Sequence, residues 1–227
     1  MGKTIEFARP DGAIAAGYVA EPSESGDAPG VVIFEEWWGL NQEIKDTADR
    51  LAGDGFRAIV PDLYRGRVAA TGDEANHLME GLDFSDAVAQ DARGAAAYLK
   101  GRGAKRVGVM GFCMGGALTM LAAMHDPDFA SAVVFYGYPP PEGGDPAAIA
   151  IPIMGHWARH DTFFTMEGVD AIERAFKAGS VPYEFHRYDA KHAFCNPVGL
   201  GNYHPEHAET AWKRTVEFLK RTLHASS

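Results

Sequence analysis

Short apolar runs alternate along the chain with longer segments of helical periodicity, from the run VVIF at 31–34 onward. Runs that are apolar throughout suit strands buried on both faces, as in parallel sheets. Between them, segments such as 41–54 place Ile44, Ala48 and Leu51 on one side of a helix. This alternation predicts an α/β fold, with a mostly parallel central sheet and helices on both of its faces.

The predicted elements follow one another with few long interruptions. Strands are expected at 3–8, 13–20, 31–34, 56–64, 106–112, 131–137, 151–158 and 181–188. Helices are expected at 41–54, from a Ser85 cap to about Lys100, at 115–125, at 165–178, and in a final amphipathic segment with Trp212, Val216, Leu219 and Leu223 on one side.

Two connections stand out from this alternation. Arg9-Pro10-Asp11-Gly12 has turn chemistry and predicts an N-terminal β-hairpin. The segment 65–84 is the least regular connection, and such excursions often line a site like a lid. No stretch reads as an interdomain linker, so we expect one domain over residues 1–227.

Composition and charge narrow the classes of function. The chain has 227 residues, 46% of them hydrophobic, and a formal net charge of −10. The acidic balance argues against a nucleic-acid partner, which usually shows a basic patch. No apolar run approaches the roughly 18 residues of a membrane-spanning helix, and no signal-peptide core is visible. Two cysteines suit a reducing compartment. We therefore expect a cytoplasmic protein without membrane association, monomeric or alternatively a homodimer.

A cysteine stands where a predicted strand passes into a helix. The stretch GFCMG at 111–115 has the form G-x-nucleophile-x-G in the strand-turn-helix context that this motif needs. The two glycines let strand and helix approach closely and lift Cys113 above the sheet edge. The positive end of the helix dipole favours a thiolate there. The alternative is a buried structural cysteine, which the strand before and the helix after disfavour.

A nucleophile of this kind needs a base and a group that orients the base. Asp161 and His192 each follow a predicted strand, in the chain order nucleophile, acid, histidine. Since the carboxyl ends of parallel strands share one sheet edge, both are expected beside Cys113. His160 is the rival base, and Asp170 and Asp189 are the rival acids.

Other cofactor and metal signals are weak. His156 and His160 have the i, i+4 spacing of a zinc helix, but the stretch from 156 to 160 begins inside a predicted strand and lacks the His-Glu-x-x-His pattern. No dinucleotide fingerprint or phosphate-binding loop is present. We therefore expect neither a metal nor an organic cofactor.

The sequence resembles the dienelactone hydrolase (carboxymethylenebutenolidase) family of α/β-hydrolases over nearly its whole length. The resemblance rests on VVIFEEWWGLN, GFRAIVPDLY and VGVMGFCMGGAL, and on the loops that carry Asp161 and His192. It implies an α/β-hydrolase fold and hydrolysis of a small-molecule ester or lactone without a cofactor. Cys113 would form the acyl-enzyme, with His192 as base and Asp161 orienting it.

The resemblance also assigns the residues after the strand VVIF. Glu36 resembles the carboxylate that pairs with the thiol at rest and helps to generate the thiolate when substrate arrives. Its neighbour Glu35 is the residue with which it could be confused. The backbone N–H groups of Met114 and Trp37 would form the oxyanion hole.

This sequence departs from the family where the substrate carboxylate is bound. The family uses two arginines there, and the matching positions here hold Asn196 and Gly72; Arg65 and Arg67 are near the second position but have no assigned place. A neutral or larger ester or lactone is therefore expected as substrate. Asn196 stays a substrate-binding candidate, and the aromatic candidates for an apolar pocket are Trp37, Trp38, Tyr64, Phe163, Phe164 and Tyr203.

Two other classes of function stay open from the sequence. A thiol redox or peroxide-sensing protein would use Cys113 and Cys195, which would form a disulfide on oxidation. A non-catalytic binding module would keep the fold without turnover, but such a protein does not need an acid and a base in this order.

Overall fold

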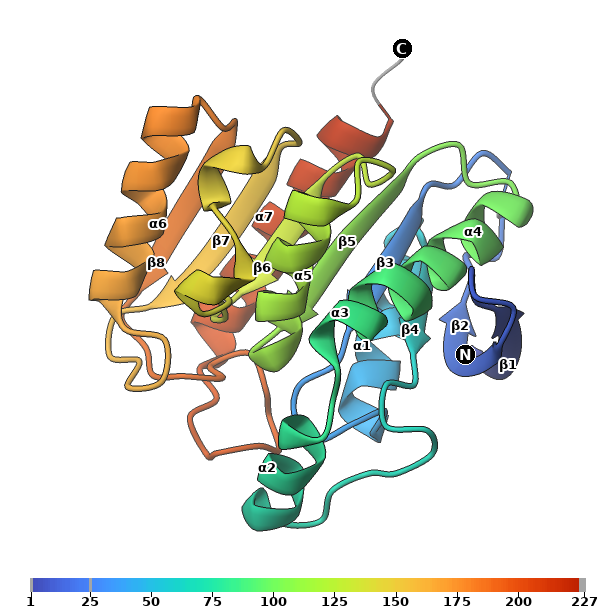
Figure 1. Ribbon diagram of the computed structural model, residues 1–227, viewed down its shortest axis with the longest axis horizontal. Coiled ribbons are helices and arrows are strands. Elements are labelled where there is room, and N and C mark those ends of the chain that lie inside the picture. Colours follow the sequence, from blue (N-terminus) through green and yellow to red (C-terminus); the bar gives the residue numbers. More distant parts are fainter. Residues whose placement is uncertain (1, 25, 225–227) are drawn as a thin grey trace.

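The protein is built on a single eight-stranded sheet, seen in a computed structural model that describes residues 2–24 and 26–224 (Figure 1). The strands are β1 (Lys3–Ala8), β2 (Ile14–Ala20), β3 (Gly30–Phe34), β4 (Arg57–Pro61), β5 (Val107–Phe112), β6 (Ala132–Phe135), β7 (Ile153–Ala158) and β8 (Tyr183–Tyr188). Their order is β1-β2-β4-β3-β5-β6-β7-β8. The first two strands form the expected antiparallel hairpin, and β2 pairs antiparallel with β4. The other six strands are parallel, which is the α/β-hydrolase fold expected from the sequence.

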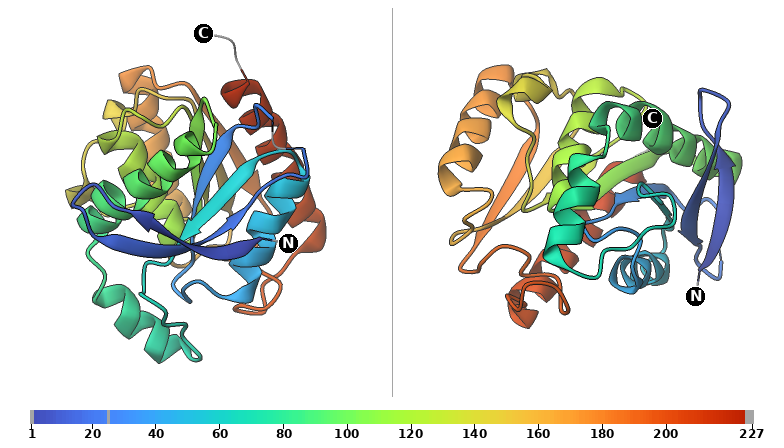
Figure 2. Two further views of the ribbon diagram at one scale, coloured as in Figure 1. Left: turned by 90° about the vertical axis from the view of Figure 1, so that its right-hand side faces the viewer. Right: turned by 60° about the horizontal axis from the view of Figure 1, so that its bottom comes forward.

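Helices cover both faces of this sheet. They are α1 (Gln42–Gly53), α2 (Gly72–Glu80), α3 (Phe84–Asp86), the π-helix η1 (Ala87–Ala92), α4 (Arg93–Gly101), α5 (Met114–His125), the 3₁₀ turns η2 (Pro141–Gly143) and η3 (Pro146–Ala148), α6 (Met166–Gly179) and α7 (Pro205–Leu223). Helices α4, α5 and α6 lie on one face, and α1 and α7 lie on the other (Figures 1 and 2). Within residues 2–24 and 26–224, no helix is long and apolar enough to cross a bilayer.

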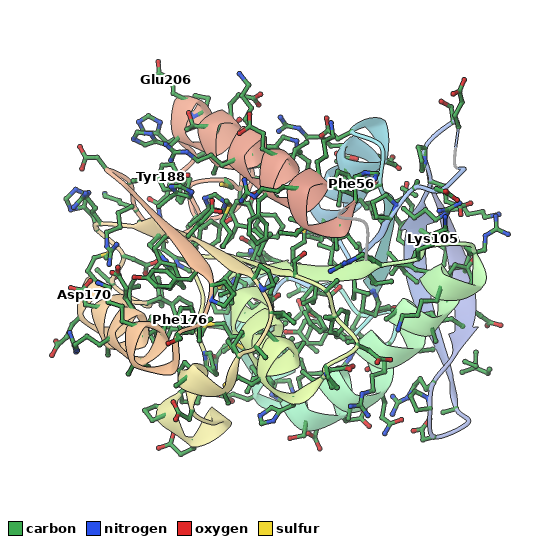
Figure 3. All side chains as sticks on the ribbon, turned by 90° about the horizontal axis from the view of Figure 1, so that it is seen from above. Phe56, Lys105, Asp170, Phe176, Tyr188 and Glu206 are labelled. Atoms are coloured by element: carbon green, nitrogen blue, oxygen red, sulfur yellow. The ribbon has the colours of Figure 1, made fainter. Side chains whose placement is uncertain are left out.

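The sheet separates two hydrophobic cores. Successive strand side chains point to opposite faces, so Val32 and Phe34 of β3 join the core on the α4, α5 and α6 side, while Ile33 joins the core under α1 and α7. In Figure 3, Phe176 of α6 and Tyr188 of β8 lie on opposite sides of the sheet. Burial on both faces explains why β3 is apolar throughout.

The segment 65–84 is more regular than the sequence indicates, because it contains α2. The Thr71 hydroxyl caps this helix by accepting from the N–H of Glu74, and the Glu74 carboxylate accepts from the N–H of Ala70. These reciprocal bonds resemble a capping box. The expectation of an irregular connection was therefore wrong for 72–80, and α2 lies beyond the carboxyl edge of the sheet (Figure 1).

The next helix also begins differently from the prediction. Its cap is Asp83, whose carboxylate accepts from the N–H groups of Ser85 and Asp86, and not Ser85 itself. Residues 87–92 then wind as a π-helix before α4. This π turn carries the buried Asp91, which forms ion pairs with Arg9 of the hairpin and with Arg65.

Candidate active site

Five parallel strands end at one edge of the sheet, and each is followed by a residue of the candidate site. Glu36 follows β3, Cys113 follows β5, Tyr136 follows β6, Asp161 follows β7, and His192 follows β8. These strands are consecutive neighbours in the sheet. Ligand sites in open α/β folds form at this carboxyl edge.

The turn around Cys113 is strained and tightly packed. Cys113 has φ 54° and ψ −116°, a backbone conformation that residues other than glycine rarely adopt. A Cβ at Gly111 would lie 2.2 Å from the carbonyl oxygen of Gly115, and one at Gly115 would lie 2.4 Å from that of Phe34. A Cβ at Gly137 would lie 1.9 Å from the carbonyl oxygen of Cys113. Glycine at these positions therefore allows the strand and α5 to meet closely enough to raise the thiol.

The thiol, the imidazole and a carboxylate form one hydrogen-bonded chain. Nε2 of His192 lies 3.1 Å from Sγ of Cys113, and Nδ1 of His192 lies 2.7 Å from Oδ2 of Asp161. His192 and Asp161 are buried, while Cys113 is partly exposed. The carboxylate favours the tautomer in which Nδ1 carries a proton, so Nε2 is free to accept the thiol proton.

Asp161 also sets the aromatic surroundings of His192. Its second oxygen, Oδ1, accepts from the N–H groups of Phe163 and Phe164 at 2.8 and 2.9 Å. The rings of these residues lie 5.0 and 5.6 Å from the imidazole, and the ring of Tyr136 lies 5.2 Å from it. The imidazole is therefore held by hydrogen bonds at both ring nitrogens and by contact with three aromatic rings.

Glu36 lies beside the thiol but is held by other partners. Its Oε1 accepts from the hydroxyl of Tyr136 at 3.3 Å, and its Oε2 accepts from the side-chain amide of Asn196. The structure thus pairs the thiol with His192, and places Glu36 in contact with Tyr136 and Asn196 instead. Burial raises the pKa of Glu36, against the lowering effect of these donors and of His192.

The electrostatics of the site favour a protonated thiol. Burial is the largest cause that raises the pKa of Cys113 well above its ordinary range, and the charge of Glu36 adds to it. The backbone N–H of Met114 donates to the sulfur and acts in the opposite direction. These effects together favour a neutral thiol in contact with His192 over a preformed thiolate.

The two predicted oxyanion donors belong to residues that line the same cavity as this thiol. Met114 is the first residue of α5, and Trp37 lies in the turn after β3. Neither N–H donates to a backbone carbonyl in the described part of the chain. Both residues line the cavity that contains the thiol.

A mainly apolar cavity of about 280 Å³ lies over the thiol. Of the seven substrate-pocket candidates, Trp37, Trp38, Phe163 and Phe164 line it. Tyr64 does not, because it is buried and its hydroxyl donates to Sδ of Met114. Asn196, whose amide is bonded to Glu36, and Tyr203 line a separate cavity instead. The other lining residues are Glu36, Asn76, Met79, Cys113, Met114, His192, Ala193 and Leu200.

Arg65 and Arg67, which are close to position 72 in the sequence, do not line this cavity. Arg65 binds the buried Asp91 at 2.8 Å, and Arg67 is exposed and does not line the cavity. Position 72 does lie close by, since a Cβ on Gly72 would be 3.9 Å from the Trp37 ring. The structure therefore supplies no arginine where the family resemblance places its carboxylate-binding ones.

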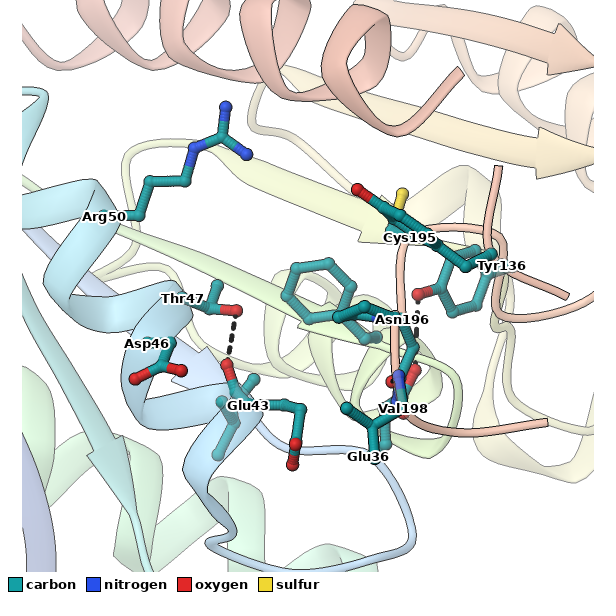
Figure 4. A pocket seen from close by; sticks show the side chains of 13 residues that line it. Glu36, Glu43, Asp46, Thr47, Arg50, Tyr136, Cys195, Asn196 and Val198 are labelled. Carbon is teal, nitrogen blue, oxygen red and sulfur yellow. Dashed lines mark hydrogen bonds between the residues drawn. The ribbon is translucent and has the colours of Figure 1, made fainter. Parts of the chain in front are cut away.

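A second cavity, also of about 280 Å³, lies on the other side of Glu36 (Figure 4). It is bordered by α1 with Arg50 and by the loop with Cys195 and Asn196. Cys195 lines this cavity, Cys113 lines the first, and both thiols are free. Glu36 lines both cavities.

The rival residues of the sequence analysis lie outside the site. His160 and Asp189 bind each other at 2.6 Å on the surface, and Asp170 binds Arg187. His156 is fully buried between Tyr188 and Thr215. Within residues 2–24 and 26–224, no three His, Cys, Asp or Glu side chains are grouped to hold a metal ion.

One site residue, Tyr136, is absent from the sequence prediction. It has the positive φ of 37° and connects Glu36 to the ring plane of His192. A third strained residue, Ala193 with φ 62°, follows His192 directly. Non-glycine residues in such conformations cluster at functional sites, which agrees with the position of all three around the thiol.

Known proteins resemble this chain over nearly its full length. The profile of the dienelactone hydrolase family matches residues 15–223. "Protein usf" of Aquifex pyrophilus is 36% identical over 234 residues, covering 98% of this chain and 100% of that protein. "Putative carboxymethylenebutenolidase" of Aquifex aeolicus (strain VF5) is 33% identical over 233 residues, with the same coverage. A crystal structure of a "Putative Dienelactone Hydrolase" from Klebsiella pneumoniae subsp. pneumoniae MGH 78578 superposes with a TM-score of 0.85 at 27% identity, covering 97% of this chain and 99% of that one. A match of this extent shows that the chain belongs to the dienelactone hydrolase family and is a carboxylic ester hydrolase.

Proposed function

We propose that this protein hydrolyses small carboxylic esters or lactones through a thioester formed on Cys113. The observation that carries the proposal is the unbroken chain from Sγ of Cys113 to Nε2 of His192, and from Nδ1 of His192 to Asp161. This is the relation of nucleophile, base and orienting acid that acyl transfer requires.

In the first half-reaction, His192 accepts the thiol proton at Nε2 while the sulfur attacks the carbonyl carbon. The carbonyl oxygen becomes an oxyanion, which accepts hydrogen bonds from the N–H groups of Met114 and Trp37. The intermediate collapses with cleavage of the ester C–O bond. The imidazolium then gives its proton to the leaving alcohol oxygen, so that a thioester and a neutral His192 are left.

In the second half-reaction, His192 takes a proton from water, and the resulting hydroxide attacks the thioester carbon. The C–S bond breaks, the sulfur leaves and regains the proton from His192, and the carboxylic acid product departs. Asp161 keeps its proton-free state throughout and stabilises each imidazolium.

Glu36 acts on the sulfur through charge in this proposal. Burial is the larger cause that raises the pKa of Cys113, and the Glu36 carboxylate raises it further, which favours the protonated thiol at rest. Because a neutral thiol is a weak nucleophile and a poor target for oxidants, the sulfur reacts mainly when His192 can receive its proton in the presence of a bound carbonyl.

The test compares two alanine variants that remove one thiol each. We expect Cys113→Ala to lower kcat/KM for p-nitrophenyl acetate on the order of 10³-fold or more, as removal of a nucleophile does in other acyl-transfer enzymes. Cys195→Ala, the matched control, should keep wild-type turnover, because Cys195 lines the other cavity. Turnover that survives in Cys113→Ala would refute the nucleophile assignment.

A parallel assay with dienelactone tests whether the substrate preference of this protein differs from that expected of its family. We expect dienelactone to be a poor substrate of the wild type, because none of the described residues that line the cavity over the thiol is an arginine. Efficient dienelactone turnover would mean that other residues hold its carboxylate.

A further inference from the structure

We propose that the cavity over Cys113 selects esters whose acyl part is uncharged and apolar, and that it rejects acyl groups with a terminal carboxylate. The inference rests on the proposed function and names its substrate class. It is carried by three observations, which concern the lining of the cavity, its charges and its rim.

The lining of the cavity offers mainly carbon surface. Trp37, Trp38, Met79 and Phe164 supply large apolar side chains, and Asn76 of α2 adds an amide at the edge. Ligand pockets of this kind bind chiefly by burying apolar area, and a few polar groups set orientation. With a volume of about 280 Å³, the cavity lies near the lower end of the size range of small-molecule sites.

The charges at the cavity are unfavourable for an anionic substrate. No arginine or lysine is among the described residues that line it. The carboxylate that does line it belongs to Glu36, and its two hydrogen-bond donors, Tyr136 and Asn196, are already engaged. A second carboxylate brought into the cavity would be desolvated without a cation and would be repelled by Glu36.

The rim of the cavity extends the apolar surface outward. Phe163 and Leu200 line the cavity and are 63% and 41% exposed. Val68 and Val198, which are 47% and 69% exposed, line an adjoining groove with Trp38. Exposed apolar side chains gathered at one place usually mark a binding surface. An acyl chain longer than the cavity can therefore continue along this rim.

Two matched substrates test the charge selectivity. p-Nitrophenyl butyrate and p-nitrophenyl hemisuccinate have acyl chains of equal length, but the second ends in a carboxylate. We expect the wild type to prefer the butyrate in kcat/KM on the order of a hundredfold or more, as for an unpaired buried charge. From acetate to butyrate to hexanoate, each added methylene should raise kcat/KM about fourfold until the cavity is filled.

Two variants on α2 test whether the missing cation is the cause. Asn76→Arg places a guanidinium at the cavity edge and should raise the hemisuccinate-to-butyrate ratio by about tenfold or more, through charge-assisted hydrogen bonds. His77→Arg, the control, adds the same charge at an exposed neighbour that does not line the cavity, and it should leave the ratio unchanged.

Several outcomes overturn the selectivity proposal while leaving the proposed function intact. One is wild-type turnover of hemisuccinate as efficient as that of butyrate, with both activities lost in Cys113→Ala. Another is an equal change of the ratio in Asn76→Arg and His77→Arg, which would indicate a long-range field and not the cavity. Absence of turnover for every ester would instead refute the proposed function.

Discussion

Replacing Gly115 with alanine tests whether the close approach of strand and helix holds the nucleophile in place. Gly115 is the second residue of α5, one residue after Met114, the proposed oxyanion donor. An added Cβ would lie 2.4 Å from the carbonyl oxygen of Phe34 and 2.6 Å from that of Glu35. Both obstacles are backbone atoms at the end of β3, so no side chain can rotate away to make room.

The size of the effect follows from these distances. Real Cβ contacts essentially never fall below 3.0 Å, so α5 must move away from β3 by roughly 0.6 Å. Overpacking of this kind costs about 1–3 kcal/mol of the unfolding free energy. Since a displacement of about 1 Å in an active site can cost about 10²-fold in rate, we expect Gly115→Ala to lower kcat/KM about tenfold or more.

The assay combines urea unfolding with kcat/KM for p-nitrophenyl acetate, measured where the variant is folded. Gly53→Ala is the matched control, because a Cβ there meets nothing within 4 Å at the end of α1. This control should keep wild-type activity and gain up to about 1 kcal/mol of stability. A Gly115→Ala variant with wild-type stability and activity would refute the packing account of the turn.

Three further predictions concern the ionisable groups. Asp161→Asn should lower kcat by on the order of 10³-fold or more through loss of the required His192 tautomer, a loss measured in pre-steady-state ester hydrolysis; a change below tenfold would contradict the orienting role. Glu36→Gln should speed alkylation of Cys113 by iodoacetamide at pH 7, because removal of the charge lowers the pKa of the thiol. An alkylation rate with the same pH dependence in variant and wild type would contradict this effect of Glu36. Glu35 is fully buried beside Asp62, which raises its pKa well above 4.5. The folded chain therefore keeps a proton that the unfolded chain releases, so stability falls as pH rises above about 4.5. Glu35→Gln should remove that fall in the free energy of unfolding, measured with urea between pH 5 and pH 8. The same dependence of the unfolding free energy on pH in variant and wild type would refute this role of Glu35.

Much of the fold follows from the sequence because its signals are local and strong. β3 and β5 are continuous apolar runs, and their burial on both faces is typical of a parallel sheet covered by helices. The helix α2 was missed because GDEANHLME begins with glycine and has few apolar residues. Its capping signal, Thr71 with Glu74 three residues later, was present in the sequence and could have located it. Asp91 of the π-helix η1 pairs with Arg9 and Arg65, which are distant in the sequence, and no local pattern reveals these pairs.

The candidate site likewise contains residues that could be predicted from the sequence and residues that could not. Cys113, Asp161 and His192 could be predicted because each follows a parallel strand, and the same rule applied to β6 would have pointed to Tyr136. Tyr64 and Asn196 were expected in the substrate cavity. Instead, the Tyr64 hydroxyl donates to Met114, and the Asn196 amide donates to Glu36. Their sequence positions are next to the site, but the direction of a side chain depends on packing that only the structure reveals.

The most direct test of the acyl-enzyme is the mass of the protein quenched during turnover of p-nitrophenyl acetate, followed by peptide mapping. The account predicts one acetyl group on the peptide that contains Cys113, present in wild type and Cys195→Ser and absent from Cys113→Ala. An acetyl group on Cys195, or steady turnover in Cys113→Ala, would contradict it.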